Sequence, residues 1–120
     1  MSSSEYKSSF LDDKSEIALV KLSSSVLGGN DALSFTSILD ELTTSAAKCI
    51  IIDACDVQIM NSTGIGMLAN AHSNLSKNGL RMMLVNVPAK ILKLLTMTHL
   101  DRVFKIYDNI DTALAECKTK

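Results

Sequence analysis

The chain has 120 residues, of which 47% are apolar and 21% charged, a composition typical of one globular domain and not of a disordered segment. Twelve basic against thirteen acidic residues give a formal net charge of −1, so nothing in the charge favours nucleic acid as a partner. No apolar run is long enough to cross a bilayer and no signal peptide is visible, so we expect a cytoplasmic protein without membrane insertion.

The first half of the sequence predicts two strands, a helix and a third strand. The serine-rich start is expected to be frayed, with an edge strand over residues 6–10, and the β-rich run 17–22 predicts the next strand. Gly28-Gly29 marks an irregular connection, after which Asn30 or Asp31 can cap a helix. The apolar stripe of that helix is Phe35, Ile38, Leu39, Leu42 and Ala46. The continuous apolar run 49–52 predicts a central parallel strand.

The second half alternates helices and strands. An amphipathic helix carrying Ile65, Leu68, Ala69, His72 and Leu75 is expected to end before Asn78-Gly79. Strands are predicted over 82–85 and 103–107, and Pro88 opens a helix between them. A final helix carries the stripe Ile110, Ala113, Leu114 and Cys117. The whole chain, 1–120, is therefore predicted to be one α/β domain, with a mixed, mainly parallel sheet of four to five strands and four helices.

The three cysteines are Cys49, Cys55 and Cys117. Their odd number and lack of metal-ligand spacing argue against a disulfide framework and against a zinc site. We expect them to be small apolar residues in a reducing compartment. Asp53 and Asp56 are interpreted as loop acids that cap or bind solvent, and neither a metal nor a cofactor is expected.

The segment from Ile52 to Gly66 joins the central strand to the second helix, where parallel α/β folds gather function. Ser62 and Thr63 are predicted at N-cap or first-turn positions, where a hydroxyl can accept from an unpaired backbone N–H. Gly64 and Gly66 lack side chains, so a ligand or partner can approach closely. From the pattern alone, Asn61, Ser62 and Thr63 can equally be a simple cap, and the glycines simple close packing.

Two other interpretations, a serine hydrolase and a nucleotide-binding site, find little support in these residues. A serine hydrolase needs a histidine base, but His72 lies on the apolar stripe of its own helix, and no glycine elbow flanks Ser62. The Gly64-Ile65-Gly66 pair belongs to neither a dinucleotide fingerprint nor a phosphate loop. We therefore expect no catalytic residues.

The run Asn61-Ser62-Thr63-Gly64-Ile65-Gly66, preceded by Ile50-Ile51-Ile52-Asp53, resembles the phosphorylation site of the bacterial STAS-domain anti-sigma-factor antagonists. That family shows an apolar strand ending in Asp and then Asp-Ser-Ser/Thr-Gly-Leu/Ile-Gly at a helix start; Asn61 stands where Asp is usual. The likeness continues through residues 78–87, 91–101 and 113–114. His99 stands where the family commonly has a glycine, a replacement that histidine tolerates if the backbone there is left-handed.

This resemblance implies a STAS domain that acts by partner switching. Ser62, or as second choice Thr63, would be phosphorylated by an anti-sigma factor that is a serine kinase of histidine-kinase-like ATPase fold, and a serine phosphatase would reset the switch. The unphosphorylated form would bind that kinase. The implied partner-binding residues are Asn61, Ser62, Thr63, Gly64, Ile65, Gly66 and Met67, and the loop 23–27 is expected to join them.

Two further expectations concern the same region. Met60 and Met67 flank the switch, and one of them is expected to offer an exposed apolar contact. A phosphate at a helix start is expected to leave the fold unchanged, because the helix dipole favours anions there. Similar domains also serve as non-phosphorylated scaffold subunits of signalling or lipid-transport complexes, and that role is the alternative.

Overall fold

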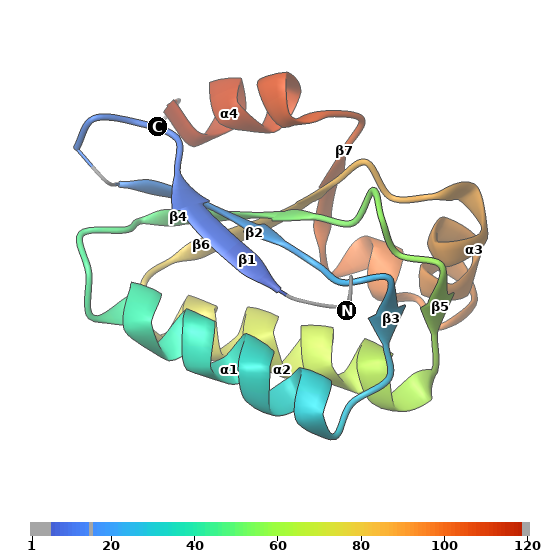
Figure 1. Cartoon of the computed structure of the whole chain (residues 1–120). Helices are drawn as coiled ribbons and strands as arrows, with labels where there is room; N and C mark the ends of the chain where they lie inside the picture. The colour runs from blue at the N-terminus through green and yellow to red at the C-terminus, as the bar shows by residue number, and fades with distance from the viewer. Residues whose placement is uncertain (1–5, 15, 119–120) are drawn as a thin grey trace.

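The structure is a computed structural model that describes residues 6–14 and 16–118, so the frayed start expected before residue 6 lies outside it. The described residues form a five-stranded sheet with helices on both faces (Figure 1). The strands of this sheet are β1 (Lys7–Phe10), β2 (Ile17–Lys21), β4 (Cys49–Asp53), β6 (Arg81–Val85) and β7 (Lys105–Tyr107). The helices are α1 (Asn30–Thr43), α2 (Ser62–Lys77), α3 (Ala89–Met97), the 3-10 turn η1 (Leu100–Arg102) and α4 (Ile110–Lys118).

The strand order is β1-β2-β4-β6-β7, with β1 antiparallel to β2 and every other pair parallel. All five residues of the central strand β4 are buried, which explains its continuous apolar run. The predicted α/β class, with a mainly parallel sheet and four helices in the described residues, is confirmed.

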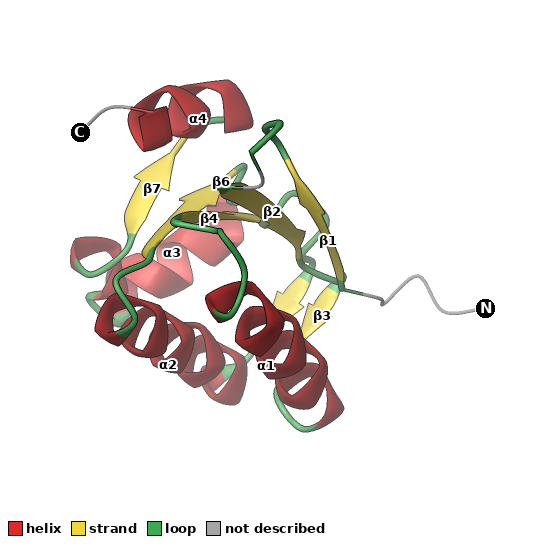
Figure 2. Ribbon diagram, turned by 90° about the vertical axis from the view of Figure 1, so that its left-hand side faces the viewer, coloured by secondary structure: helices red, strands yellow, loops and turns green. Residues whose placement is uncertain are grey.

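Alternate residues of β4 face two separate cores. Ile50 and Ile52 join the core under α1, α2 and α3, whereas Cys49 and Ile51 face α4. Figure 2 shows α1 and α2 side by side on one side of the sheet and α4 alone on the other. The start of α2 therefore lies on the three-helix face of the sheet, and α4 covers the opposite face.

The boundaries of α1 differ from the prediction. Gly29, with a positive φ of 59°, is the N-cap residue, so the expectation that Asn30 or Asp31 caps the helix is wrong. A second positive φ at Gly28 closes the preceding turn, and α1 begins directly after it. Ala46 lies beyond the end of the helix and is exposed, and Ala47 is buried in its place. His99 is left-handed, with φ 63°, so the condition under which histidine can replace glycine there is met.

The cysteines are the largest departure from the sequence interpretation. Cys49 and Cys117 form a disulfide, and Cys55 is a free, exposed thiol. The side chain of Cys49 points to the α4 face of the sheet, and the last turn of α4 brings Cys117 over it, with the two Cα atoms 6.1 Å apart. The expectation of three unpaired cysteines is wrong, because the pairing depends on where α4 packs and not on spacing in the sequence.

Candidate functional site at the start of helix α2

Asn61 is the N-cap of α2, and its side-chain Oδ1 accepts from the Gly64 N–H at 2.8 Å. Ser62 is therefore the first residue of the helix and Thr63 the second, which confirms a first-turn position for both. The amide of Asn61, which stands in the position where the resembling family has Asp, is occupied with capping. Both hydroxyl-bearing residues are exposed to solvent.

Gly64 is buried against the chain's own backbone. A Cβ atom at this position would lie 1.9 Å from the Val26 carbonyl oxygen, so the glycine lets β3 (Ser25–Val26) pack directly on the first turn of α2. The expectation that Gly64 admits an external partner is therefore wrong. At Gly66, by contrast, a Cβ would meet no atom within 4 Å. Of the two glycines, Gly66 leaves open space.

A small parallel pair of strands lies beside the switch. β3 pairs with β5 (Ile59–Met60), the strand that leads into α2 (Figure 1). The N–H groups of Gln58 and Ile59 both donate to the Ser24 carbonyl oxygen, at 2.8 and 3.1 Å. The loop 23–27 is thereby placed next to the start of α2.

The apolar contact surface near the switch is not formed by methionine. Met60 and Met67 are only 8% and 7% exposed, so the expectation that one of them is exposed is wrong. Leu27, which follows β3, and Ile59, the first residue of β5, are 39% and 56% exposed instead. Alternation along β5 turns Ile59 outward and Met60 inward.

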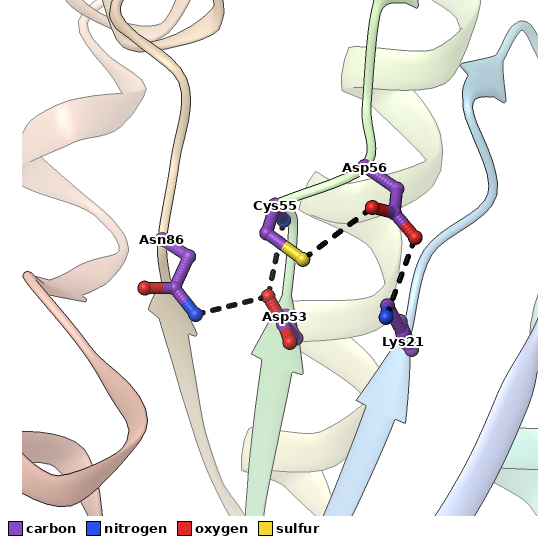
Figure 3. A network of polar contacts seen from close by, with 5 residues as sticks. All are labelled: Lys21, Asp53, Cys55, Asp56 and Asn86. Carbon is purple, nitrogen blue, oxygen red and sulfur yellow. Dashed lines mark hydrogen bonds and ion pairs between the residues drawn. The ribbon is translucent and has the colours of Figure 1, made fainter.

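A polar network at the carboxyl ends of β2, β4 and β6 holds the loop that precedes the switch (Figure 3). Buried Asp53 accepts from the Cys55 N–H at 3.0 Å and from Asn86 Nδ2 at 3.2 Å, and Asn86 is left-handed with φ 55°. Asp56 forms an ion pair with Lys21 at 3.3 Å and raises the pKa of that amine. The capping role expected of Asp53 is confirmed.

The thiol of Cys55 sits within this network. Partial burial, the hydrogen bond and charge of Asp53, and the charge of Asp56 raise its pKa to about 11. The thiol is therefore almost fully protonated at neutral pH and is a poor nucleophile. The network positions the loop that leads to α2.

Residues 57–76, which include the switch, contain no Asp, Glu, Lys or Arg. The first turn of α2 carries no acidic residue. The N–H groups of Ser62 and Thr63 have no partner within the helix, because the N-cap Asn61 accepts from the N–H groups of Gly64 and Ile65. An anion attached at Ser62 would meet these N–H groups and the positive end of the helix dipole.

His72 is not placed to act as a base on Ser62. His72 lies ten residues further along α2, about 15 Å by helical rise, and its ring packs edge-on against Phe104 with centroids 5.7 Å apart. Across residues 6–14 and 16–118, no group of three His, Cys, Asp or Glu residues is placed to hold a metal. No helix in the described part of the chain is long and apolar enough to span a membrane.

Comparison with known proteins agrees with this geometry. The STAS domain model matches residues 11–113, and the chain belongs to the STAS domain family. A Thermotoga maritima protein provisionally named as an anti-sigma factor antagonist is 31% identical over 83 residues, covering 69% of this chain and 74% of that protein.

Two solved structures share the fold. One is the crystal structure of a Thermotoga maritima protein that is named provisionally as an anti-sigma factor antagonist. It superposes on this chain with a TM-score of 0.72 at 26% identity and covers 92% of each chain. The anti-sigma factor antagonist SpoIIAA in its unphosphorylated form superposes with a TM-score of 0.78 at 14% identity, covering 96% of this chain and 97% of SpoIIAA. The second likeness is one of fold alone.

The sequence interpretation missed three features of the site. The β3–β5 pair consists of strands of two residues each, too short to give a periodic pattern. The turn at Gly28 packs against Thr63, since a Cβ at Gly28 would lie 2.3 Å from Thr63 Cγ2. The two exposed apolar residues, Leu27 and Ile59, had no signal beyond their hydropathy.

Proposed function

We propose that the chain is an anti-sigma factor antagonist that binds an anti-sigma kinase when unphosphorylated and is released by phosphorylation of Ser62. The observation that carries this proposal is the exposed Ser62 hydroxyl on the first residue of α2, next to a cap supplied by Asn61. Because Asn61 caps the helix, the Ser62 side chain has no capping task and is available for modification. The names of the relatives in the STAS family support the same role.

Thr63 is the weaker candidate for the phosphate. Its methyl group packs on the Gly28 turn, so its side chain is committed to holding that turn against α2. Ser62 has no comparable contact with Gly28. We therefore assign the phosphate to Ser62.

The proposed partner surface consists of the first two turns of α2 and the adjoining small sheet. Asn61, Ser62, Thr63 and Gly66 provide an exposed or open uncharged face, and Leu27 and Ile59 add apolar contact area. Gly64, Ile65 and Met67 are buried and support this surface from below. A phosphate would add about −1.5 to −2 charges to a segment that carries none, which would disrupt the interface by charge and bulk.

The proposed partners are a serine kinase with an ATPase fold of the histidine-kinase type, which phosphorylates Ser62, and a serine phosphatase, which removes the phosphate. The proposed location of this chain is the cytoplasm. It assigns no catalytic activity to this chain, since His72 is too far along α2 to activate Ser62. The alternative, a scaffold subunit that is never phosphorylated, predicts the same fold without modification at Ser62.

A matched set of variants tests the switch. The chain is incubated with ATP and the ATPase-type anti-sigma factors of its own organism, and phosphate is located by mass spectrometry. Ser62→Ala is expected to abolish phosphorylation, and Thr63→Ala to retain it. Among binding variants, Ser62→Glu is expected to lose affinity at least tenfold more than its uncharged counterpart Ser62→Gln. Phosphorylation of Ser62→Ala, or equal affinities of the two binding variants, would count against the proposal.

A further inference from the structure

The C-terminal helix is tied to the centre of the sheet by a covalent bond. Cys49 is the first residue of β4 and Cys117 lies in the last turn of α4, 68 positions later in the sequence. The Sδ atom of Met83 lies 4.0 Å from the Cys49 sulfur and 3.6 Å from the Cys117 sulfur. The disulfide therefore belongs to the packed face between α4 and the sheet.

The two cysteines differ in their exposure to solvent. Cys49 is only 2% exposed, whereas Cys117 is half-buried. A cavity of about 320 Å³ opens at the disulfide and is lined by both cysteines together with Asp12, Glu16, Ile17, Lys48 and Lys118. A small molecule in this cavity therefore meets both cysteines, of which Cys117 is the more exposed.

The size and charge of the cavity define its occupant. A volume of about 320 Å³ is at the small end of ligand pockets, which admits a peptide-sized molecule but not a folded protein. The lining carries two amines, Lys48 and Lys118, and two carboxylates, Asp12 and Glu16, so its charges balance, and Glu16 lies 3.8 Å from Lys48 Nζ. A small thiol that carries both an amine and a carboxylate, such as an amino acid or short peptide thiol, matches a lining with charges of both signs.

We propose that the Cys49–Cys117 bond is a thiol-exchange site, at which a low-molecular-weight thiol releases the end of α4 from the sheet. The thiolate of the small molecule attacks Cys117 Sγ, forms a mixed disulfide with it, and expels Cys49 as a thiolate that takes a proton from water. A second small thiol attacks the mixed disulfide, which yields the oxidised small molecule and the Cys117 thiol. In total, two electrons pass from two small thiols to the Cys49–Cys117 disulfide. The oxidised small molecule can drive the two exchange steps in the opposite direction and restore the disulfide.

The structure indicates what this exchange changes. α4 has nine residues, and Ala113 is its only buried residue among those described. A helix of this length is marginal without tertiary support. Without the bond, the last turn keeps the hydrogen bond from Arg81 Nη1 to the Glu116 carbonyl oxygen at 3.2 Å and the packing of Leu114. The end of α4 therefore opens more often in the reduced chain.

This site is separate from the phosphorylation switch. α2 lies on the opposite face of the sheet from α4 (Figure 2), and the free thiol Cys55 lies beyond the other end of β4 from Cys49. The raised pKa of Cys55 also keeps its thiol protonated, so it does not compete as the attacking group. The two proposals can fail independently.

The first test counts thiols in protein purified without reductant. Alkylation after unfolding is expected to label Cys55 alone, and alkylation after full reduction to label all three cysteines. Three labelled cysteines in air-equilibrated protein would overturn the proposal. This measurement needs no variant and does not depend on the fold of a mutant.

The second test uses two matched variants and glutathione disulfide as the probe. Cys49→Ser leaves the accessible Cys117, and Cys117→Ser leaves the buried Cys49, so glutathione is expected to be attached at least tenfold faster in the first variant. Equal rates would overturn the assigned direction of attack. In the wild-type chain, reduction by glutathione is expected to speed amide exchange through local opening about tenfold in the last turn of α4 and not in α2, where exchange rises only through the lower stability of the whole chain. An unchanged rate of amide exchange in the last turn of α4 would contradict the proposal that reduction releases this helix end from the sheet.

Discussion

Replacing Gly64 by alanine tests how the switch is built. The added Cβ would stand 1.9 Å from the Val26 carbonyl oxygen and 2.7 Å from its carbonyl carbon. A normal contact between carbon and oxygen is about 3.2 Å, so β3 and α2 must separate by more than 1 Å. Overpacking of this kind costs about 1–3 kcal/mol, which exceeds the gain of about 0.5–1 kcal/mol from placing alanine in a helix. We expect Gly64→Ala to lose about 2 kcal/mol of stability.

Gly66→Ala is the matched control, because a Cβ there meets nothing within 4 Å. This variant is expected to gain about 0.5–1 kcal/mol from helix propensity alone. Urea unfolding followed by far-UV circular dichroism suits a chain that has no Trp. With a slope of about 2 kcal/mol/M, the midpoint of Gly64→Ala should fall by about 1 M and that of Gly66→Ala should rise. Equal stability of the two variants would refute the packing of Val26 on Gly64.

Three further measurements follow from the same structure. Asn61→Ala removes the hydrogen bond to the Gly64 N–H and should lower the unfolding free energy by about 1 kcal/mol. Asn61→Asp keeps a capping oxygen and adds a favourable charge, so it should not lower the unfolding free energy. An equal loss in both variants would exclude the cap. Reducing the Cys49–Cys117 bond opens a loop of 68 positions and should lower the unfolding free energy by about 4 kcal/mol. Urea titrations with and without reductant measure this loss. Equal unfolding free energies in the two titrations would show that the bond does not constrain the unfolded chain. The rate of Cys55 alkylation should rise about tenfold per pH unit until the pH reaches the raised pKa of the thiol, about 11, because only the thiolate reacts. A plateau of the rate near pH 9 would show that Asp53 and Asp56 do not act on the thiol.

The sequence was sufficient for the parts of the fold that repeat a pattern. The uninterrupted apolar run of β4 predicted a central strand, since only a strand covered on both faces needs no polar side. Asn78-Gly79 marked the end of α2, and Asn78 is its C-cap in the structure. Each of these signals is local, so no knowledge of the tertiary contacts was needed.

The details of the site depend on contacts between distant segments. Asn61, Ser62 and Thr63 are all good capping residues, and only the register of α2 decides that Asn61 caps it. The need for glycine at position 64 comes from Val26, which belongs to a strand far earlier in the chain. In the same way, the disulfide requires the packing of α4, which the spacing of three cysteines does not encode.

The most direct measurement of the switch is the phosphorylation state of the native chain. The protein is purified from its own cells with phosphatases inhibited, and intact mass and fragment spectra are recorded. The proposed function predicts a fraction of molecules with a single added phosphate, located on Ser62 and lost on treatment with a serine phosphatase. Protein that carries no phosphate under any growth condition, or carries it elsewhere than on Ser62, would contradict the switch and favour an unmodified scaffold.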